Sequence, residues 1–284
     1  MNPADYVIDA PIGDHLRQRR RLSSEQIDDV LQYQRERGMR FGEAAIALGL
    51  VSSDDVLWAL SRQFRYPYAP DPRHAFDPEL VAAVDPFGDD AEVFRDLRSQ
   101  LMVEMAGSSV PGQALAILST DVGDGKTYFA ANLAVAFGQL GAKTLLIDAD
   151  LRTPRQHRLF ALSEGPGLSG VLSGRSEKQV MRRVGQLPSL HVLPVGALPP
   201  NPLELVQRPA FSFLMRDVAS TFDHVIVDTP AAAQGADARV IAAACGAALV
   251  IGRRRKTRMR ALQRLLNDLA RAGTRVAGVM INEY

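Results

Sequence analysis

The stretch from residue 114 to residue 127, Ala-Leu-Ala-Ile-Leu-Ser-Thr-Asp-Val-Gly-Asp-Gly-Lys-Thr, decides the fold of this chain. Its apolar half, residues 114–118, predicts a buried strand, and the alanine-rich amphipathic segment over residues 128–140 predicts a helix. A glycine-rich turn between strand and helix is the setting of a phosphate-binding P-loop. Glycines at 123 and 125 allow backbone N–H groups to surround phosphate oxygens, and the N-terminal end of the helix adds positive charge.

Individual positions of this turn have predicted roles in nucleotide binding. We expect Lys126 to bridge the terminal phosphates and the Thr127 hydroxyl to bind Mg²⁺. The candidate nucleotide contacts in this stretch are Gly123, Asp124, Gly125, Lys126, Thr127 and Tyr128. Thr120 stands where a P-loop usually has its first glycine, so an ordinary strand-to-helix turn is the alternative for this stretch taken alone.

Two further apolar strands are predicted to end in carboxylates. Residues 144–147 lead to Asp148 and Asp150, and residues 225–227 lead to Asp228. The carboxyl ends of parallel strands point into the crevice in which doubly wound sheets bind ligands, and alternation puts Asp148 and Asp150 on one side. Together with the P-loop they predict a nucleotide and Mg²⁺ site, in which Asp228 holds the metal and Asp148 or Asp150 accepts a proton from an attacking hydroxyl.

Apolar runs alternate with helical segments throughout the C-terminal two thirds of the chain. The runs cover residues 114–118, 144–147, 190–195, 225–227, 247–251 and 276–281. Such alternation predicts an α/β domain whose doubly wound, mostly parallel sheet is covered by helices on both faces.

The order of these motifs resembles the Walker A, A′ and B motifs of bacterial tyrosine kinases, which belong with the MinD and ParA proteins to the deviant P-loop ATPases. The A′ and B motifs are Asp148-Ala149-Asp150-Leu151-Arg152 and Ile226-Val227-Asp228-Thr229-Pro230. Further segments that fit the family are residues 151–160, 167–172, the proline-rich 198–205, 256–258 and 279–282. The resemblance therefore covers the chain from about residue 91 to its end.

The resemblance implies an ATP- and Mg²⁺-dependent enzyme that transfers the γ-phosphoryl group to tyrosine. The catalytic residues that it implies are Lys126, Asp148, Asp150 and Asp228, with Asp148 as the base. The metal is assigned to Thr127, Asp150 and Asp228. Arg152 and Asn282 are implied as further nucleotide contacts, Asn282 at the purine edge.

In this family a Glu-x-x-Arg-x-x-Arg pattern before the P-loop helps neighbouring subunits to associate. Glu92, Arg95 and Arg98 match it, which implies a homo-oligomer. The alternative is a solvated helix face, because residues three apart are neighbours on a helix.

Two departures from the family bear on the reaction. MinD and ParA proteins carry an extra lysine early in the P-loop where this chain has Asp121, which argues against a positioning ATPase of that type. The tyrosine cluster that usually ends these kinases is reduced to Tyr284, and the other tyrosines are at 6, 33, 66, 68 and 128. The candidate phosphoacceptor is therefore Tyr284, with a tyrosine of the linker or a tyrosine on another protein as the alternatives. A slow ATP-hydrolysing switch that phosphorylates no tyrosine is the alternative function.

The N-terminal part contains an internal repeat. Residues 12–16 align with residues 41–45 at an offset of 29, and the same offset pairs residues 22–24 with residues 51–53. Each copy predicts a short helix, a turn with a serine N-cap and a second amphipathic helix. Two such copies predict a small all-α domain that buries its own apolar faces.

This repeat resembles the N-terminal domain of type II secretion and pilus ATPases, whose best-known versions bind cyclic di-GMP. The second copy keeps Arg40, Gly42 and Gly49 of that family's motif, whereas the first has Pro11 for the arginine and Arg20 for the glycine. Proline can neither stack on a guanine nor bind a phosphate. The domain is therefore expected either to bind cyclic di-GMP or, in preference, to dock a protein.

Prolines at 67, 70, 72, 78 and 86 predict an extended connection between the two parts. We therefore expect a helical domain over residues 1–69, a linker over residues 70–90 and the kinase domain over residues 91–284.

Composition limits the partners. A net charge of +1 gives no global attraction to nucleic acid, and no apolar run approaches the roughly 20 residues that a membrane span needs. A cytoplasmic chain is expected. The resemblance to chain-length determinant kinases of exopolysaccharide gene clusters implies a membrane-embedded polysaccharide copolymerase as activator, which would recruit the chain to the inner membrane.

Overall fold

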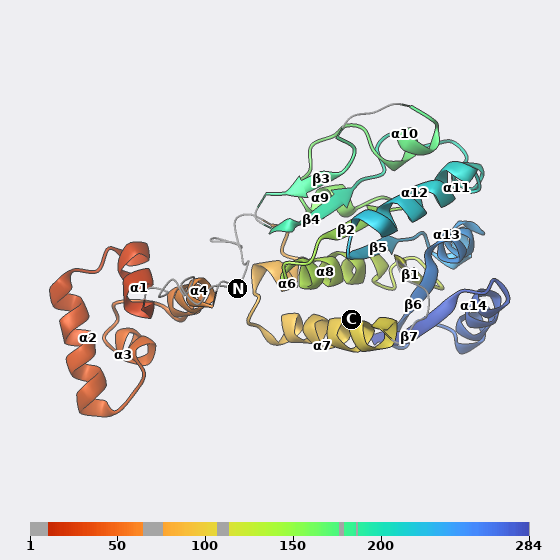
Figure 1. Cartoon of the computed structure of the whole chain (residues 1–284). Helices are drawn as coiled ribbons and strands as arrows, with labels where there is room; N and C mark the ends of the chain where they lie inside the picture. The colour runs from red at the N-terminus through yellow and green to blue at the C-terminus, as the bar shows by residue number, and fades with distance from the viewer. Residues whose placement is uncertain (1–10, 65–75, 107–113, 176–178, 186, 284) are drawn as a thin grey trace. The chain divides into compact units, whose positions relative to one another are not determined.

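The structure, a computed structural model, describes residues 11–64, 76–106, 114–175, 179–185 and 187–283 (Figure 1). The chain divides into two compact units, residues 1–70 and residues 71–284. In the described part, no helix is both long enough and apolar enough to cross a lipid bilayer.

The first unit repeats one helical pair. Its helices are α1 (Ile12–Arg20), α2 (Ser24–Arg37), α3 (Phe41–Ala47) and α4 (Ser53–Gln63). The starts of α3 and α4 lie 29 residues after those of α1 and α2, as the sequence repeat predicts. Ser23 and Ser52 are the predicted N-caps, and each hydroxyl accepts a hydrogen bond from the backbone N–H three residues later, at 3.2 Å.

The core of the first unit is built from equivalent positions of the two copies. The buried pairs are Leu16 and Ala45, Leu22 and Val51, and Val30 and Ala59. The smaller second-copy residues are matched by larger side chains elsewhere in the cluster, among them Phe41 and Trp58. The unit therefore has a hydrophobic core of its own.

A buried carboxylate joins the first and last helices of this unit. Asp55 of α4 is 1% exposed and accepts hydrogen bonds from Arg19 at 2.9 Å and from Arg20 at 2.7 Å, both of α1. Arg20 occupies the place of a motif glycine in the first copy, and here its guanidinium is committed to Asp55. The Arg19 guanidinium also lies over the Trp58 ring, 4.8 Å from its centroid.

The second unit contains a seven-stranded sheet in the order β3-β4-β2-β5-β1-β6-β7. The strands are β1 (Ala114–Ser119), β2 (Thr144–Asp148), β3 (Arg182–Val184), β4 (Leu187–Leu193), β5 (His224–Asp228), β6 (Gly246–Arg253) and β7 (Arg275–Asn282). All neighbours are parallel except β3, which runs antiparallel to β4 at the edge. The six predicted strands are confirmed, and the sequence did not predict β3 because it is short and two of its three residues are arginines.

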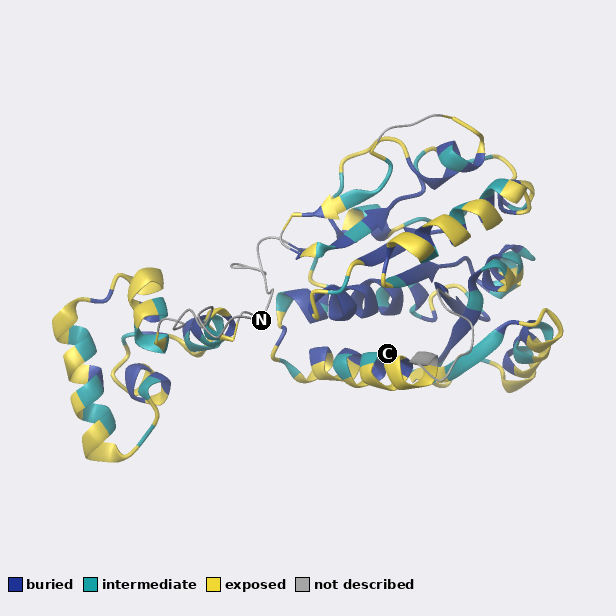
Figure 2. Ribbon diagram, viewed as in Figure 1, coloured by how far each residue is buried: buried dark blue, intermediate teal, exposed yellow. Residues whose placement is uncertain are grey.

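Helices cover both faces of this sheet, as the doubly wound prediction requires. On one face α8 (Lys126–Gly138) packs against four strands, and α7 (Asp89–Ala106) packs on α8 (Figure 2). Alanines along α8 let it lie close to the sheet, and its side chains are buried along almost its whole length.

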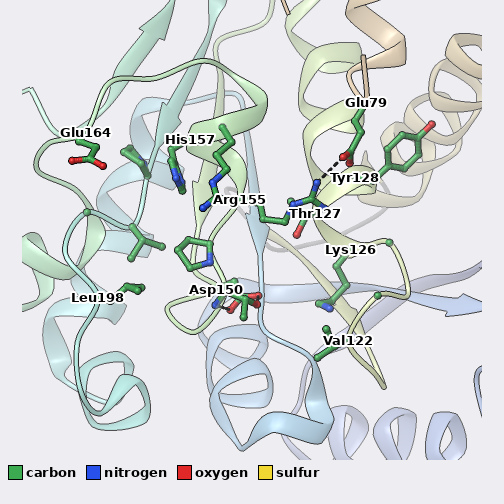
Figure 3. Close-up of a pocket in the computed structure, with 18 of the residues that line it drawn as sticks. Glu79, Val122, Lys126, Thr127, Tyr128, Asp150, Arg155, His157, Glu164 and Leu198 are labelled. Atoms are coloured by element: carbon green, nitrogen blue, oxygen red, sulfur yellow. Dashed lines mark hydrogen bonds and ion pairs between the residues drawn. The ribbon is translucent and has the colours of Figure 1, made fainter. Parts of the chain in front are cut away.

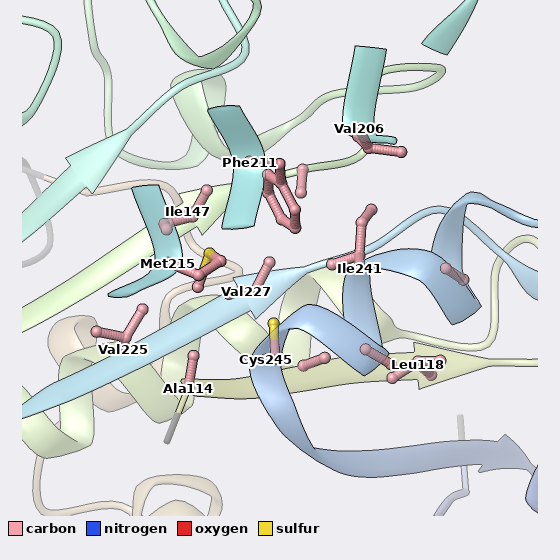
Figure 4. Packing of buried hydrophobic residues seen from close by; sticks show 14 of the residues in the cluster. Ala114, Leu118, Ile147, Val206, Phe211, Met215, Val225, Val227, Ile241 and Cys245 are labelled. Atoms are coloured by element: carbon pink, nitrogen blue, oxygen red, sulfur yellow. The ribbon is translucent and has the colours of Figure 1, made fainter. Parts of the chain in front are cut away.

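The opposite face carries the larger hydrophobic core. Its helices are α10 (Leu168–Leu172), α11 (Pro202–Val206), α12 (Pro209–Thr221), α13 (Asp237–Cys245) and α14 (Met259–Arg271). Phe211 and Met215 of α12 and Ile241 of α13 share one buried cluster with Ile147 and Val227 of the strands (Figure 4). Two short elements, α9 (Gln156–Leu159) and the 3₁₀ turn η2 (Ala232–Gln234), lie in loops that follow β2 and β5.

Residues 76–88 differ from the extended linker that the prolines predict. This segment, which we call the strap, includes α6 (Val81–Val84) and packs on α8. Leu80 is fully buried, and the side chain of Asn132 in α8 accepts a hydrogen bond from the Ala82 N–H and donates one to the Glu79 carbonyl. The buried amide of Asn132 holds the strap because it satisfies the Ala82 N–H, in the first turn of α6, and the Glu79 carbonyl before that helix.

Candidate functional site

The predicted P-loop connects the carboxyl end of β1 to α8. Gly123 and Gly125 have φ angles of 81° and 105°, in the left-handed region that favours glycine. Gly125 also has no room for a side chain, because a Cβ at this position would lie 2.5 Å from the amide nitrogen of Asn282. Both glycines are thus required by backbone conformation or by close approach.

Asp124 shapes this loop from inside. Its side chain is fully buried, and its Oδ2 accepts a hydrogen bond from the Asp121 N–H at 2.9 Å. The Thr120 hydroxyl lies 2.9 Å from Asp121 Oδ2 and 3.4 Å from Asp124 Oδ2. The Asp124 carboxylate fixes the turn in which threonine replaces the usual first glycine, and the predicted nucleotide contact of Asp124 remains a prediction.

The three predicted carboxylates gather at the ends of neighbouring strands. Asp148 and Asp228 are direct partners in the register of β2 and β5, and both are fully buried. Asp148 accepts hydrogen bonds from the backbone N–H of Asp150 at 3.2 Å and of Gln156 at 3.0 Å. Burial, reinforced by the nearby charge of Asp228, raises the pKa of Asp148 well above its usual value.

Asp150 is the carboxylate of the A′ motif that lines the cavity, whereas Asp148 lies behind it. Its Oδ1 accepts hydrogen bonds from the N–H groups of Arg152 at 3.1 Å and Thr153 at 2.9 Å, and its Oδ2 accepts one from the Thr153 hydroxyl at 2.9 Å. These donors fix the direction of the carboxylate at the cavity wall.

Burial raises the pKa of Asp228 to about 6, although hydrogen bonds from the side chains of Gln156 and Thr127 and the charge of Lys126 lower it. Its Oδ2 accepts the hydrogen bond from Gln156 Nε2 at 2.9 Å. Its Oδ1 is buried and has no hydrogen-bond partner among the described residues. Gln156 lies in the segment 151–160 that resembles the family, but the sequence predicted no role for it.

A cavity of about 1180 Å³ opens beside the P-loop (Figure 3). Lys126, Thr127 and Asp150 lie on one side of it, and Glu164 and Leu198 lie on the other. The predicted contacts that line this cavity are Gly123, Gly125, Lys126, Thr127, Tyr128, Asp150 and Asn282. The cavity is larger than the several hundred Å³ of most small-molecule sites.

The strap also contributes to the rim of this cavity. Glu79 and Arg155 both line it, and their side chains form an ion pair at 2.6 Å (Figure 3). Neither residue was predicted to lie at the site. Glu79 belongs to the strap, which was expected to be part of an extended linker, and the sequence motifs assigned no role to Arg155.

Arg152 of the A′ motif forms an ion pair with α13. Its Nε donates to Asp237 Oδ2 of α13 at 2.5 Å, and Arg152 does not line the cavity. The hydrogen bond to Asp237, opposed by partial burial, raises the pKa of the Arg152 guanidinium. Arg152 thus forms an ion pair between the A′ motif and α13, and its predicted nucleotide contact remains a prediction.

Asn282 and the basic segment after β6 meet on the P-loop. Asn282 Nδ2 donates to the Asp124 carbonyl at 3.0 Å, so its amide lies over the loop backbone. Arg253 donates to the Gly123 carbonyl at 3.0 Å, and Lys256 donates to the Val122 carbonyl at 3.3 Å. The side chains of Arg253 and Lys256 therefore lie against the P-loop backbone at Val122 and Gly123. This is the loop that has Asp121 where MinD and ParA proteins have an extra lysine.

The predicted self-association residues lie on α7 and make contacts within their own unit. Arg95 pairs with Glu92 and donates to the Pro86 carbonyl. Arg98 donates to the Ala136 carbonyl at 2.7 Å, near the end of α8. Self-association through these residues remains a prediction. The candidate phosphoacceptor Tyr284 lies outside the described residues.

The residues present fit a magnesium ion bound together with a nucleotide. The described residues include no cluster of three or more acidic, histidine or cysteine side chains that could hold a metal alone. Mg²⁺ is usually held by one or two carboxylates together with phosphate and water oxygens. The unpartnered Oδ1 of Asp228 and the neighbouring Thr127 side chain are of this kind.

Comparisons with known proteins agree with this geometry. The CobQ/CobB/MinD/ParA nucleotide binding domain matches residues 115–284. The putative tyrosine-protein kinase CapB of Staphylococcus aureus is 31% identical over 193 residues, which are 68% of this chain and 84% of CapB. The tyrosine-protein kinase ptk of Acinetobacter johnsonii is 34% identical over 192 residues, 68% of this chain, which span only 26% of that protein.

Among solved structures, the kinase domain of the Escherichia coli tyrosine kinase ETK superposes with a TM-score of 0.67 at 31% identity. The match covers 72% of this chain and 79% of the ETK chain. The family match extends over the P-loop, the A′ and B strands and the sheet that holds them. The chain therefore belongs to the bacterial tyrosine-protein kinases, within the CobQ/CobB/MinD/ParA nucleotide-binding family.

Proposed function

We propose that this chain is an ATP-dependent protein tyrosine kinase that regulates the chain length, polymerisation and export of an exopolysaccharide. One observation carries the proposal: a single cavity of about 1180 Å³ brings Lys126 and Thr127 of the P-loop together with Asp150 of the A′ motif and leaves room beyond them. A nucleotide fills only part of such a space. The remainder suits the side chain that receives the phosphoryl group.

The chain's own residues would do the chemistry by positioning and by moving one proton. Backbone N–H groups at Gly123 and Gly125 and the charge of Lys126 hold the phosphates. The acceptor's hydroxyl oxygen bonds to the γ-phosphorus while the bond from this phosphorus to the β–γ bridging oxygen breaks, and ADP leaves. The hydroxyl proton passes to one of the two A′ carboxylates: Asp150 lines the cavity, and burial beside Asp228 raises the pKa of Asp148 well above its usual value.

Thr127 and Asp228 would hold the magnesium ion, with Asp150 nearby at the cavity wall. Bound there, Mg²⁺ would neutralise charge on the phosphate oxygens. The ion would also lower the pKa of the neighbouring carboxylates, because a cation beside them favours their ionised form.

We propose a membrane-embedded polysaccharide copolymerase as the activating partner, which would recruit a cytoplasmic kinase to the inner membrane. The resemblance to chain-length determinant kinases supports this partner. A homo-oligomer is proposed from the Glu92, Arg95 and Arg98 pattern. The N-terminal unit is proposed to dock a protein, with cyclic di-GMP as the alternative ligand.

Mass spectrometry of the intact chain and of its peptides after incubation with Mg-ATP tests the kinase. We expect phosphate on a tyrosine, with Tyr284 as the first candidate, and no phosphate in Lys126→Met. ATP consumption without any phosphotyrosine would instead support a switch ATPase, which the small number of tyrosines favours.

The same assay assigns the proton acceptor. We expect Asp148→Asn to lower kcat by about 100-fold or more with little change in the KM for ATP, because the base acts in the transition state. Unchanged kcat in Asp148→Asn and a comparable loss in Asp150→Asn would assign the proton to Asp150.

A further inference from the structure

Gln156 is a fully buried glutamine that contacts all three parts of the nucleotide site. Its backbone N–H donates to Asp148 Oδ2 at 3.0 Å. Its side-chain Nε2 donates to Asp228 Oδ2 at 2.9 Å and to the Thr127 carbonyl at 3.1 Å. One residue at the start of α9 thus joins the A′ motif, the B strand and the P-loop helix.

The hydrogen-bonding capacity of the Gln156 side chain is not fully satisfied. A glutamine amide has two N–H donors and one oxygen acceptor, and both donors of Gln156 have acceptors. Its Oε1 and the Oδ1 of Asp228 are both buried and without a hydrogen-bond partner among the described residues. Because an unsatisfied buried oxygen costs on the order of 1–3 kcal/mol, two of them on hydrogen-bonded neighbours indicate a ligand that supplies the missing partners.

The residue type suits a cation site. An arginine or lysine at position 156 would place a positive charge against Asp228 and compete with a metal ion. A glutamate would offer Asp228 no donor and would repel it. The neutral amide instead fixes Asp228 Oδ2 by a hydrogen bond, and it leaves Oδ1 and the negative charge of the carboxylate for the metal.

We propose that Gln156 is a positioning residue for the Mg²⁺ of the bound nucleotide. It holds Asp228 so that Oδ1 is presented to the hydrated ion, and its own Oε1 accepts a hydrogen bond from a water molecule of that ion. The inference rests on the proposed Mg-nucleotide site but not on tyrosine phosphorylation. Residues that hold a metal ligand in this way typically change metal affinity by about 10- to 100-fold when they are replaced.

The test is equilibrium binding of a fluorescent ADP analogue to the full chain, in EDTA and across a Mg²⁺ titration. The variant is Gln156→Met, which keeps the length of the side chain and removes the amide. We expect its affinity in EDTA to stay within about twofold of the wild type, and its half-saturating Mg²⁺ concentration to rise about tenfold or more.

Gln139→Met is the matched control. Gln139 is another buried glutamine of the same unit, and its Nε2 donates to the Ala82 carbonyl at 2.6 Å, at the far end of α8. It loses a comparable buried hydrogen bond away from the site, so its half-saturating Mg²⁺ concentration should match the wild type. Circular dichroism melts establish that both variants are folded.

Asp228→Asn provides the second measurement. If Gln156 acts through Asp228, adding Gln156→Met to Asp228→Asn should raise the Mg²⁺ requirement by much less than it does in the wild type. Gln156→Asn, whose amide is one methylene shorter, should fall between Gln156→Met and the wild type, and it serves if Gln156→Met fails to fold.

Three results would overturn the proposal. One is an unchanged Mg²⁺ requirement in Gln156→Met, and another is an equal loss of affinity with and without Mg²⁺, which would make Gln156 purely structural. The third is a wild type whose ADP binding does not respond to Mg²⁺, which would remove the metal site itself. None of these depends on whether a tyrosine is phosphorylated, so the kinase proposal is judged separately.

Discussion

Arg152 and Asp237 join the A′ motif to α13 by an ion pair in which one partner is buried and the other is not. The Asp237 side chain is 3% exposed and that of Arg152 is 31% exposed. Removing the arginine would leave a buried carboxylate without its counter-charge, and such groups are costly to leave unpaired. The pair therefore belongs to the residues that determine stability.

Arg152→Ala should destabilise the catalytic unit by about 1–3 kcal/mol, because a charged hydrogen bond is lost and Asp237 stays buried. Asp237→Ala and the double variant complete a cycle, in which the double variant should cost clearly less than the sum of the single ones. Urea unfolding followed by circular dichroism measures all four. ADP affinity that falls tenfold in Arg152→Ala, with unfolding unchanged, would support the role that the sequence predicted for this residue.

At the level of single residues, the sequence predicts the side chains that would contact the nucleotide or its metal. It does not predict the residues that hold those side chains by hydrogen bonds. Lys126, Thr127 and Asp150, which were predicted to contact the nucleotide or its metal, line the cavity. The hydrogen bonds of the Asp124 carboxylate and of Gln156 were not predicted, because they join groups that the chain brings close only after folding. A sequence motif indicates which residues contact the ligand. It carries little information on the residues that hold those side chains in place by hydrogen bonds.

Among the elements, the strap is held by two buried side-chain amides, those of Asn132 in α8 and of Gln139 at its end. Asn132 is fully buried and bonds the Ala82 N–H at 3.0 Å and the Glu79 carbonyl at 2.8 Å. Glu79 is also the strap residue that pairs with Arg155 at the cavity rim. Loosening the strap should therefore reach the Glu79–Arg155 ion pair at the cavity rim, but not the P-loop or the carboxylates that would hold the metal.

Asn132→Leu should release the strap, since the Ala82 N–H and the Glu79 carbonyl lose their partner and about 1–3 kcal/mol of stabilisation goes with them. Hydrogen exchange with mass spectrometry should show faster exchange over residues 80–85, with protection of the central strands retained. Glu79→Gln is the control, because it breaks only an exposed ion pair and should leave this exchange nearly unchanged. Uniformly faster exchange across the whole sheet in Asn132→Leu would show that the amide supports α8 rather than the strap.

The elements of the first unit respond to pH through Asp55. Burial opposes its ionisation, but hydrogen bonds from Ser52, Arg19 and Arg20 outweigh this and hold the pKa of Asp55 well below its usual value. A depressed pKa stabilises the folded state above the unfolded pKa of about 3.9 and loses this contribution as the pH falls towards the folded value. Acid should therefore loosen the contact between α1 and α4.

Asp55→Asn should lower the free energy of unfolding of the first unit by about 1–3 kcal/mol at pH 7, and the gap to the wild type should narrow as the pH falls below about 4. Trp58 is the single tryptophan of the chain and belongs to this unit's core, so its fluorescence reports the unit within the whole protein. Asp28→Asn, an exposed change on α2, controls for the loss of one charge. A gap that is constant between pH 7 and pH 3.5 would contradict the role of the Asp55 carboxylate.

Helices and strands were predictable from the sequence wherever an apolar run or a helix N-cap indicated them. The six predicted strands and the serine caps of α2 and α4 have such signals, and the structure has them at the predicted places. The strap has none: its prolines favour an extended chain locally, and its packing depends on Asn132 and Gln139, about 50 residues further along. Long-range hydrogen bonds of this kind are outside the reach of local patterns.

For the whole molecule, the two units have separate hydrophobic cores, one built on α1 to α4 and the other on the sheet. Units with their own cores are expected to unfold as separate cooperative transitions. The P-loop, the A′ and B carboxylates and the cavity all belong to the second unit. A nucleotide should therefore stabilise only that unit.

Mg-ADP at about 100 times its Kd should stabilise the catalytic unit by about 2.7 kcal/mol, which raises the Tm of a unit of this size by roughly 5–10 °C. Far-ultraviolet circular dichroism, to which the larger unit contributes most, should show this shift, whereas the melting curve from Trp58 fluorescence should not move. Lys126→Met, which weakens phosphate binding, should abolish the shift. If the Trp58 transition rises with that of the catalytic unit, nucleotide binding and the helical repeat are thermodynamically linked, and by reciprocity a ligand of the repeat would change the affinity for nucleotide.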